Sequence, residues 1–141
     1  MKRLIPTFAL CLSLFLIDVY AQQNLSMFLP GEWFLNNADY PLGGKMVISN
    51  CANFVCDFNL QSWYDSHICD IEGKLNIKKD YAEYKEQKYK YDNKTGTEYS
   101  VSVGFLLKIT ENNNIDIHYI NTDSYDAFCG IKATLEGVWK K

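Results

Sequence analysis

The sequence predicts an all-β domain, a single antiparallel barrel or sandwich of about eight short strands that is stapled by disulfides. Apolar and polar residues alternate with period two through much of 54–139, as in strands with one buried face. Turn-forming residues separate these runs at 41–44, 92–96 and 112–114. Of the five cysteines, all but the first follow residue 21, and an even number suits two disulfides in a small exported domain.

The chain opens with a predicted signal peptide, residues 1–21. Two positive residues precede an apolar run that ends near Ile17, and Val19 and Ala21 are small residues at −3 and −1. The run is shorter than the about 20 residues that a membrane span needs, and no second run follows. We therefore expect cleavage after Ala21, one domain at 22–141, and a secreted or periplasmic protein without a membrane span. The alternative is an uncleaved anchor helix.

Each predicted strand follows from its own alternating run. The expected inward faces are Phe54, Cys56, Phe58 and Leu60; Cys69, Ile71, Gly73, Leu75 and Ile77; Tyr99, Val101, Val103, Phe105 and Leu107; Ile115, Ile117 and Tyr119; and Ile131, Ala133, Leu135, Gly137 and Trp139. Residues 62–66 form the expected hairpin tip between the first two runs. Only 80–91 is ambiguous, and we favour a strand because no apolar residue that is well suited to a core completes the helical stripe. The residues expected to fill the interior are Phe54, Phe58, Phe105, Leu107 and Trp139.

Four cysteines allow three pairings. We favour Cys51 with Cys56 and Cys69 with Cys129. The second bond would close a long loop and stabilise the fold by about 4 kcal/mol, because it restricts the unfolded chain.

Charge and composition bear on the class of partner. The chain has a formal net charge of −3, and its only arginine, Arg3, lies in the signal peptide. The lack of arginine in the mature chain argues against nucleic-acid recognition. A mildly acidic surface favours basic partners.

Residues suited to catalysis are few, so we predict no enzyme, no cofactor and no metal. His67 and His118 are the only histidines, and neither stands in a pattern that activates a nucleophile. Asp70 and Glu72 alternate to the outward face of their strand, as solvated residues do. A metal site at Cys69 with the two histidines is the alternative, but its spacing is a weak zinc signature.

Gly31-Glu32-Trp33 resembles the G-x-W motif that opens the first strand of lipocalins, and 122–125 echoes their second motif. This resemblance implies a barrel that carries a small apolar ligand. We keep such a carrier as one alternative function, and an envelope protein without a catalytic role as another.

A second resemblance involves segments later in the chain. Cys69-Asp70-Ile71-Glu72-Gly73, then Ala82 with Tyr84, then 128–133 and 137–140 resemble small exported bacterial domains grouped with the lysozyme-inhibitor lipoproteins. The resemblance implies an exported binding protein that inhibits lysozyme-type cell-wall hydrolases, which are usually basic. Two further cysteines of that group are absent here together, which implies that Cys69 pairs with Cys129.

A protein partner requires exposed anchors, and aromatic and acidic residues on loops near the disulfides are the candidates. The predicted partner-binding residues are Trp63, Tyr64 and Asp65 at the hairpin tip, and Asp123, Tyr125 and Asp126 in the loop before Cys129. The alternative is that both segments are ordinary solvated loops. The sequence predicts no oligomeric state.

Overall fold

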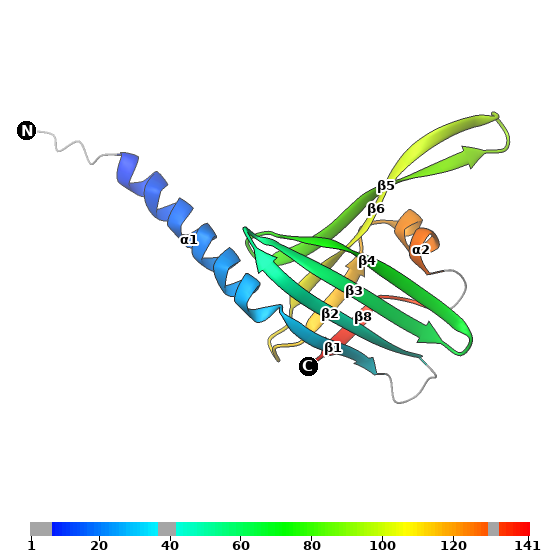
Figure 1. Ribbon diagram of the computed structural model, residues 1–141. Helices are drawn as coiled ribbons and strands as arrows, with labels where there is room; N and C mark the ends of the chain where they lie inside the picture. The colour runs from blue at the N-terminus through cyan, green and yellow to red at the C-terminus, as the bar shows by residue number, and fades with distance from the viewer. Residues whose placement is uncertain (1–6, 37–41, 130–132) are drawn as a thin grey trace, which may run out of the picture.

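A computed structural model describes residues 7–36, 42–129 and 133–141. Eight antiparallel strands follow one another in chain order, and β1 pairs with β8, so the sheet closes into a barrel (Figure 1). The elements are α1 (Thr7–Phe28), β1 (Gly31–Asn36), β2 (Leu42–Ala52), β3 (Val55–Tyr64), β4 (His67–Ile77), β5 (Tyr81–Asp92), β6 (Thr97–Ile109), β7 (Ile115–Tyr119), α2 (Thr122–Phe128) and β8 (Gly137–Lys140). Disulfides join Cys51 to Cys56 and Cys69 to Cys129. The predicted fold class and the favoured pairing are confirmed.

Two Gly-x-Trp segments begin the strands that close the barrel, β1 and β8. Gly31 and Gly137 have φ angles of 135° and 136°, a region in which side chains other than glycine's are strained. Trp33 and Trp139 are fully buried. Each indole N–H donates to the carbonyl four residues earlier, at 2.9 Å for Trp33 and 3.0 Å for Trp139. Both large side chains are thus buried with their polar group satisfied.

The inward faces agree with the alternation in the sequence except on the outer part of β6. There Tyr99, expected to face inward, is 48% exposed and Val101 is only half-buried, because this part of the strand projects from the barrel. Of the residues expected to fill the interior, Phe58, Phe105, Leu107 and Trp139 are buried, and Phe54 is partly buried. Phe128 of α2 joins the aromatic core, with its ring centroid 6.2 Å from that of Phe105. These contacts fix α2 against the barrel.

The turn predicted at 41–44 is wrong for the residues that the structure describes. Gly43 and Gly44 lie within β2, and Pro41 lies outside the described residues. Each glycine has a tryptophan ring against it: a Cβ at Gly43 would lie 2.7 Å from Trp63, and one at Gly44 would lie 2.5 Å from Trp139. The glycines make room for rings that cross the strand, and they do not form a turn.

The last strand is shorter than predicted. β8 begins at Gly137, although Ala133 and Leu135 are buried as expected, and Ile131 lies outside the described residues. The backbone N–H of Leu135 donates to the hydroxyl of Tyr119 at 2.9 Å. Before β8 begins, the side chain of Tyr119 therefore accepts a hydrogen bond that a backbone carbonyl of a neighbouring strand would otherwise accept. The ambiguous segment 80–91 is a strand, β5, as predicted.

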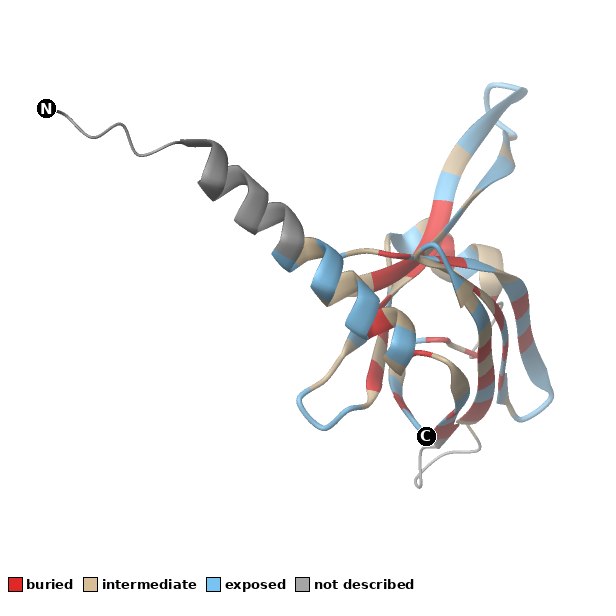
Figure 2. Ribbon diagram, turned by 60° about the vertical axis from the view of Figure 1, so that its left-hand side comes forward, coloured by how far each residue is buried: buried red, intermediate tan, exposed pale blue. Residues whose placement is uncertain are grey.

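The β5–β6 hairpin projects from the barrel as a two-stranded ribbon (Figures 1 and 2). β5 pairs with β4 only at Asn76↔Glu83 and Ile77↔Ala82, but its pairing with β6 continues out to Asp92↔Thr97. The ring of Tyr84 lies against Gly73 where β4 and β5 separate, 2.7 Å from the position of a Cβ. The outer part of the ribbon is therefore supported mainly from its base.

The C-terminal half of α1 packs on one end of the barrel. Leu25 of α1 and Leu29, the residue after the helix ends, are buried in the core, and the helix continues past the predicted cleavage point at Ala21. Within the part of the chain that the structure describes, no helix is both long and apolar enough to cross a membrane.

Candidate functional site

The predicted hairpin tip forms at the end of β3 and the start of β4. Asp65 is exposed and has a φ angle of 54°, which an aspartate in a tight turn tolerates. Trp63 points to the outer face and is 41% exposed, with its ring over Gly43. Tyr64 is half-buried and packs against the core. Trp63 and Asp65 are thus available to a partner, and Tyr64 is only partly so.

Ile68 is a further residue of this tip that the sequence analysis did not select. It is directly opposite Trp63 in the β3–β4 register and is 69% exposed. Directly paired residues share one face of a sheet with their Cβ atoms about 5 Å apart. The two side chains form an exposed apolar pair. The signal was present in the sequence, because a two-residue turn at 65–66 places Trp63 opposite Ile68.

The second predicted segment, with Asp123, Tyr125 and Asp126, is a helix and not a loop. The Asn121 side chain caps α2 by accepting a hydrogen bond from Ser124 N at 2.9 Å, and Asp123 lies in the first turn, where a negative charge is favourable. An asparagine followed by an acidic first turn is a helix start that the sequence analysis missed.

The three predicted residues of α2 differ in their surroundings. Asp123 Oδ1 is 2.5 Å from Lys90 Nζ of the ribbon, and this ion pair raises the pKa of the lysine. The ring of Tyr125 packs edge-on against Tyr119 with centroids 5.7 Å apart. Asp126 is exposed. We infer that Asp126 is the member of the three best placed to meet a partner.

An acidic groove lies where β4 and β5 separate. It has a volume of about 200 Å³ and takes side chains from β4, β5 and α2. Asp70 and Glu72 line one wall and Glu86 the other, together with a single lysine, Lys88. The ammonium of Lys88 is 3.0 Å from Glu86, so the carboxylates of β4 are left in excess. Asp70 and Glu72 are solvated as predicted, but they also share a groove.

Aromatic side chains form the inner part of this groove. Phe128 of α2 and Tyr84 of β5 line it, with ring centroids 6.0 Å apart. Burial first, and then the negative charge of Glu86, raises the pKa of Tyr84 to about 12. The phenol is therefore neutral at physiological pH and adds no charge to the groove.

The exposed pair and the groove form one continuous surface, which we call the β4 face: Trp63, Ile68, Asp70 and Glu72. Ile68, Asp70 and Glu72 follow one another on the outer side of β4, because successive outward residues are two apart. The disulfide from Cys69 to Cys129 fixes this strand to the end of α2. The β4 face and Asp126 therefore belong to one cross-linked part of the molecule.

The β5–β6 ribbon carries a second set of exposed aromatic residues. Tyr89, Tyr91 and Tyr99 are 72%, 64% and 48% exposed, and all three lie on the projecting part of the hairpin. Figure 2 shows the ribbon largely in the colour of exposed residues. Tyrosines are frequent anchors in protein interfaces, and the sequence analysis did not assign these to a surface.

Residues that could hold a metal are dispersed. Among the described residues, no three of the His, Cys, Asp and Glu side chains gather as a metal site would require. The sulfur of Cys69 is bonded to Cys129, which removes the alternative of a thiolate ligand. His118 Nε2 is 2.8 Å from Asp116 Oδ2 on the exposed side of β7.

No family model, curated protein or solved structure matches the chain.

Proposed function

We propose that the protein is an exported binding protein whose β4 face engages a basic protein partner, and that residues 1–21 are removed during export. Two disulfides support this proposal, because such bonds persist in oxidising compartments. The observation that carries it is the acidic groove beside an exposed apolar pair. Apolar anchors supply affinity, and excess negative charge attracts a basic surface.

We further propose that the partner is a lysozyme-type cell-wall hydrolase. The resemblance of 69–73 and 128–139 to the lysozyme-inhibitor group supports this choice, and the acidic character of the groove is compatible with it. A lysine or arginine of the hydrolase would enter between Asp70 and Glu86, and Trp63 and Ile68 would cover an apolar patch beside it. Asp65 and Asp126 would lie at the rim of the interface.

Calorimetric titration of the exported protein with lysozymes of different classes tests the partner. We expect a dissociation constant in the nanomolar-to-micromolar range and weaker binding as salt is added, because exposed charges are screened. No heat with any of the enzymes would contradict the partner class.

Two variants test the site. Asp70→Asn with Glu72→Gln should weaken binding by about tenfold and reduce its salt dependence, because the groove loses two charges. Asp116→Asn with Glu111→Gln removes the same number of charges at the β6–β7 turn and the start of β7, where neither residue lines the groove, and is the matched control. Equal weakening by both pairs would show that net charge, and not the groove, attracts the partner.

A further inference from the structure

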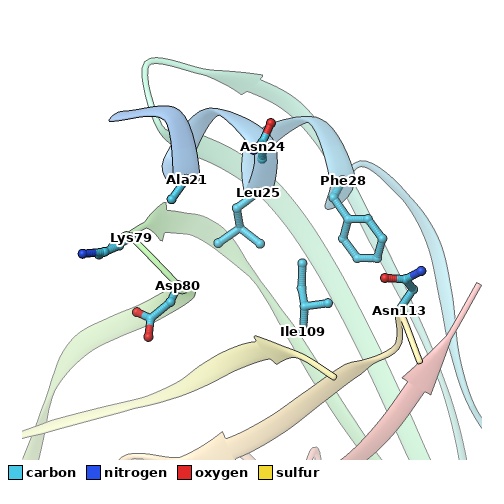
Figure 3. A pocket seen from close by; sticks show the side chains of 8 residues that line it. All are labelled: Ala21, Asn24, Leu25, Phe28, Lys79, Asp80, Ile109 and Asn113. Carbon is cyan, nitrogen blue, oxygen red and sulfur yellow. The ribbon is translucent and has the colours of Figure 1, made fainter. Parts of the chain in front are cut away.

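A pocket of about 430 Å³ lies at the other end of the barrel, between α1 and the turns that follow β4 and β6 (Figure 3). With α1 complete and Ala21 in the lining, its size is within the about 300–1,000 Å³ that is usual for small-ligand sites. It is separate from the β4 face, because none of the residues that line it belongs to that face.

The lining of this pocket is mostly apolar. Leu25 and Phe28 of α1 and Ile109 of β6 point into one shared space (Figure 3). Leu25 is buried against the core. The ammonium of Lys141 donates to the carbonyl oxygen of Phe28 at 2.9 Å and lies 5.1 Å from the centre of its ring. This wall is therefore attached to the barrel by residues that follow the predicted cleavage point.

One cation stands at the edge of this apolar space. Lys79 lines the pocket, and its ammonium is 2.6 Å from a carboxylate oxygen of Asp18. Asp18 lies in the segment that is predicted to be removed, as does Ala21, which also lines the pocket. Cleavage after Ala21 would take away the carboxylate that Lys79 binds, and would place a new amino terminus at Gln22 beside the pocket. Asp80 and Asn113 would remain at the rim.

We propose that the processed protein binds a small amphipathic carboxylate in this pocket, with the ligand's carboxylate on Lys79 and its alkyl chain against Leu25, Phe28 and Ile109. The carboxylate of Asp18 occupies the position that the ligand's would take. This proposal rests on the export and cleavage proposed above, but not on the identity of the protein partner. The ligand class is a straight-chain fatty acid of medium length.

The test uses the exported protein, with its amino terminus established by mass spectrometry. Hexanoate, octanoate and decanoate are titrated by calorimetry, and amide chemical shifts are followed by NMR. Affinity should rise about three- to fourfold for each added methylene, as expected when the chain leaves water. Shifts should concentrate at 24–28, 79–80 and 109–113, and octylammonium should bind more weakly than octanoate.

A matched pair of variants tests the cation. Lys79→Gln should weaken octanoate binding by about three- to tenfold, as expected for the loss of one charge-assisted hydrogen bond at a partly exposed site. Lys74→Gln is the control, because Lys74 also holds a carboxylate at 2.6 Å, that of Asp57 on the outer face of β3. Ile109→Ser should also weaken octanoate binding, and a melting curve establishes that this variant is folded.

Three outcomes would overturn the proposal: an exported protein that retains Asp18, shifts absent from these segments at millimolar octanoate, or equal affinities for octanoate and octylammonium. Failure of lysozyme binding would leave it standing. Lys79→Gln should leave lysozyme binding unchanged, which separates the two proposals.

Discussion

The indole ring of Trp63 lies directly on Gly43 of the neighbouring strand, so close that a Cβ at position 43 would be 2.7 Å from the ring. On the opposite side of the same strand, Trp139 lies on Gly44. Two adjacent glycines thus accept one ring outside the barrel and one ring inside. The outer ring belongs to the β4 face, and the inner ring belongs to the core.

Alanine at these two glycines should have different effects. Gly44→Ala should lower the free energy of unfolding by about 2–3 kcal/mol, because the buried Trp139 ring cannot move without strain in the packed core. Gly43→Ala should cost only about 1 kcal/mol or less, because the exposed Trp63 can swing into solvent. Urea unfolding measures both values. Equal losses would show that Trp63 is as rigidly held as Trp139.

Gly43→Ala should also weaken the binding of a partner to the β4 face, since it displaces Trp63. We expect a loss of about threefold or more in affinity, because a displaced Trp63 would no longer fit the surface of the partner. Trp63→Ala should have the larger effect. Unchanged affinity in Trp63→Ala would place the interface elsewhere, with the tyrosines of the ribbon as the next residues to substitute.

The two disulfides should contribute unequally to stability. The Cys69–Cys129 bond spans 60 residues and the Cys51–Cys56 bond spans 5. Replacing the first pair by alanine should lower the free energy of unfolding by about 4 kcal/mol, and replacing the second by about 2 kcal/mol, because the longer loop loses more freedom when closed. Chemical denaturation of the two double variants tests this order. The reverse order would contradict the loop-entropy explanation.

Stability should fall at high pH in a way that depends on Tyr84. Burial raises the pKa of Tyr84 in the folded protein to about 12, above its ordinary value of 10.0. The folded state therefore holds this proton more tightly than the unfolded state, so the contribution is complete below pH 10 and is lost as pH rises through about 12. Tyr84→Phe should show a shallower decline of unfolding free energy over this range.

Tyr119→Phe should likewise make the decline of unfolding free energy at high pH shallower, because burial is the main cause that raises the pKa of Tyr119. Urea unfolding at successive pH values gives the slopes. Identical slopes for the wild type and both variants would contradict this account.

The ion pair between Lys90 and Asp123 should restrain the β5–β6 ribbon. It joins the ribbon's outer half to α2, with 2.5 Å between Nζ and Oδ1. Lys90→Gln should speed amide hydrogen exchange along 86–102. Lys88→Gln is the matched control, because its partner Glu86 lies on the same strand. Equal exchange rates in the two variants would show that the backbone hydrogen bonds between β5 and β6 are enough to restrain the ribbon.

The sequence by itself determined most of the side chains that face inward, because period-two alternation of apolar residues reports burial on one face of a strand. It did not show that the outer part of β6 projects from the barrel, which leaves Tyr99 exposed. It also indicated the disulfide framework, since the four cysteines that follow residue 21 suit two disulfides. It located Trp63 and Asp65 at a hairpin tip, because turn chemistry is local.

Only the tertiary structure decided which segments and side chains lie side by side. The acidic groove exists because β5 leaves β4 after two paired positions, and strand alternation carries no information on where two strands separate. The residues of α2 were expected in a loop, because one cap and seven residues make a weak local signal. The pairing of Lys79 with Asp18 brings together residues 61 positions apart, and contacts across such a separation depend on the folded chain as a whole.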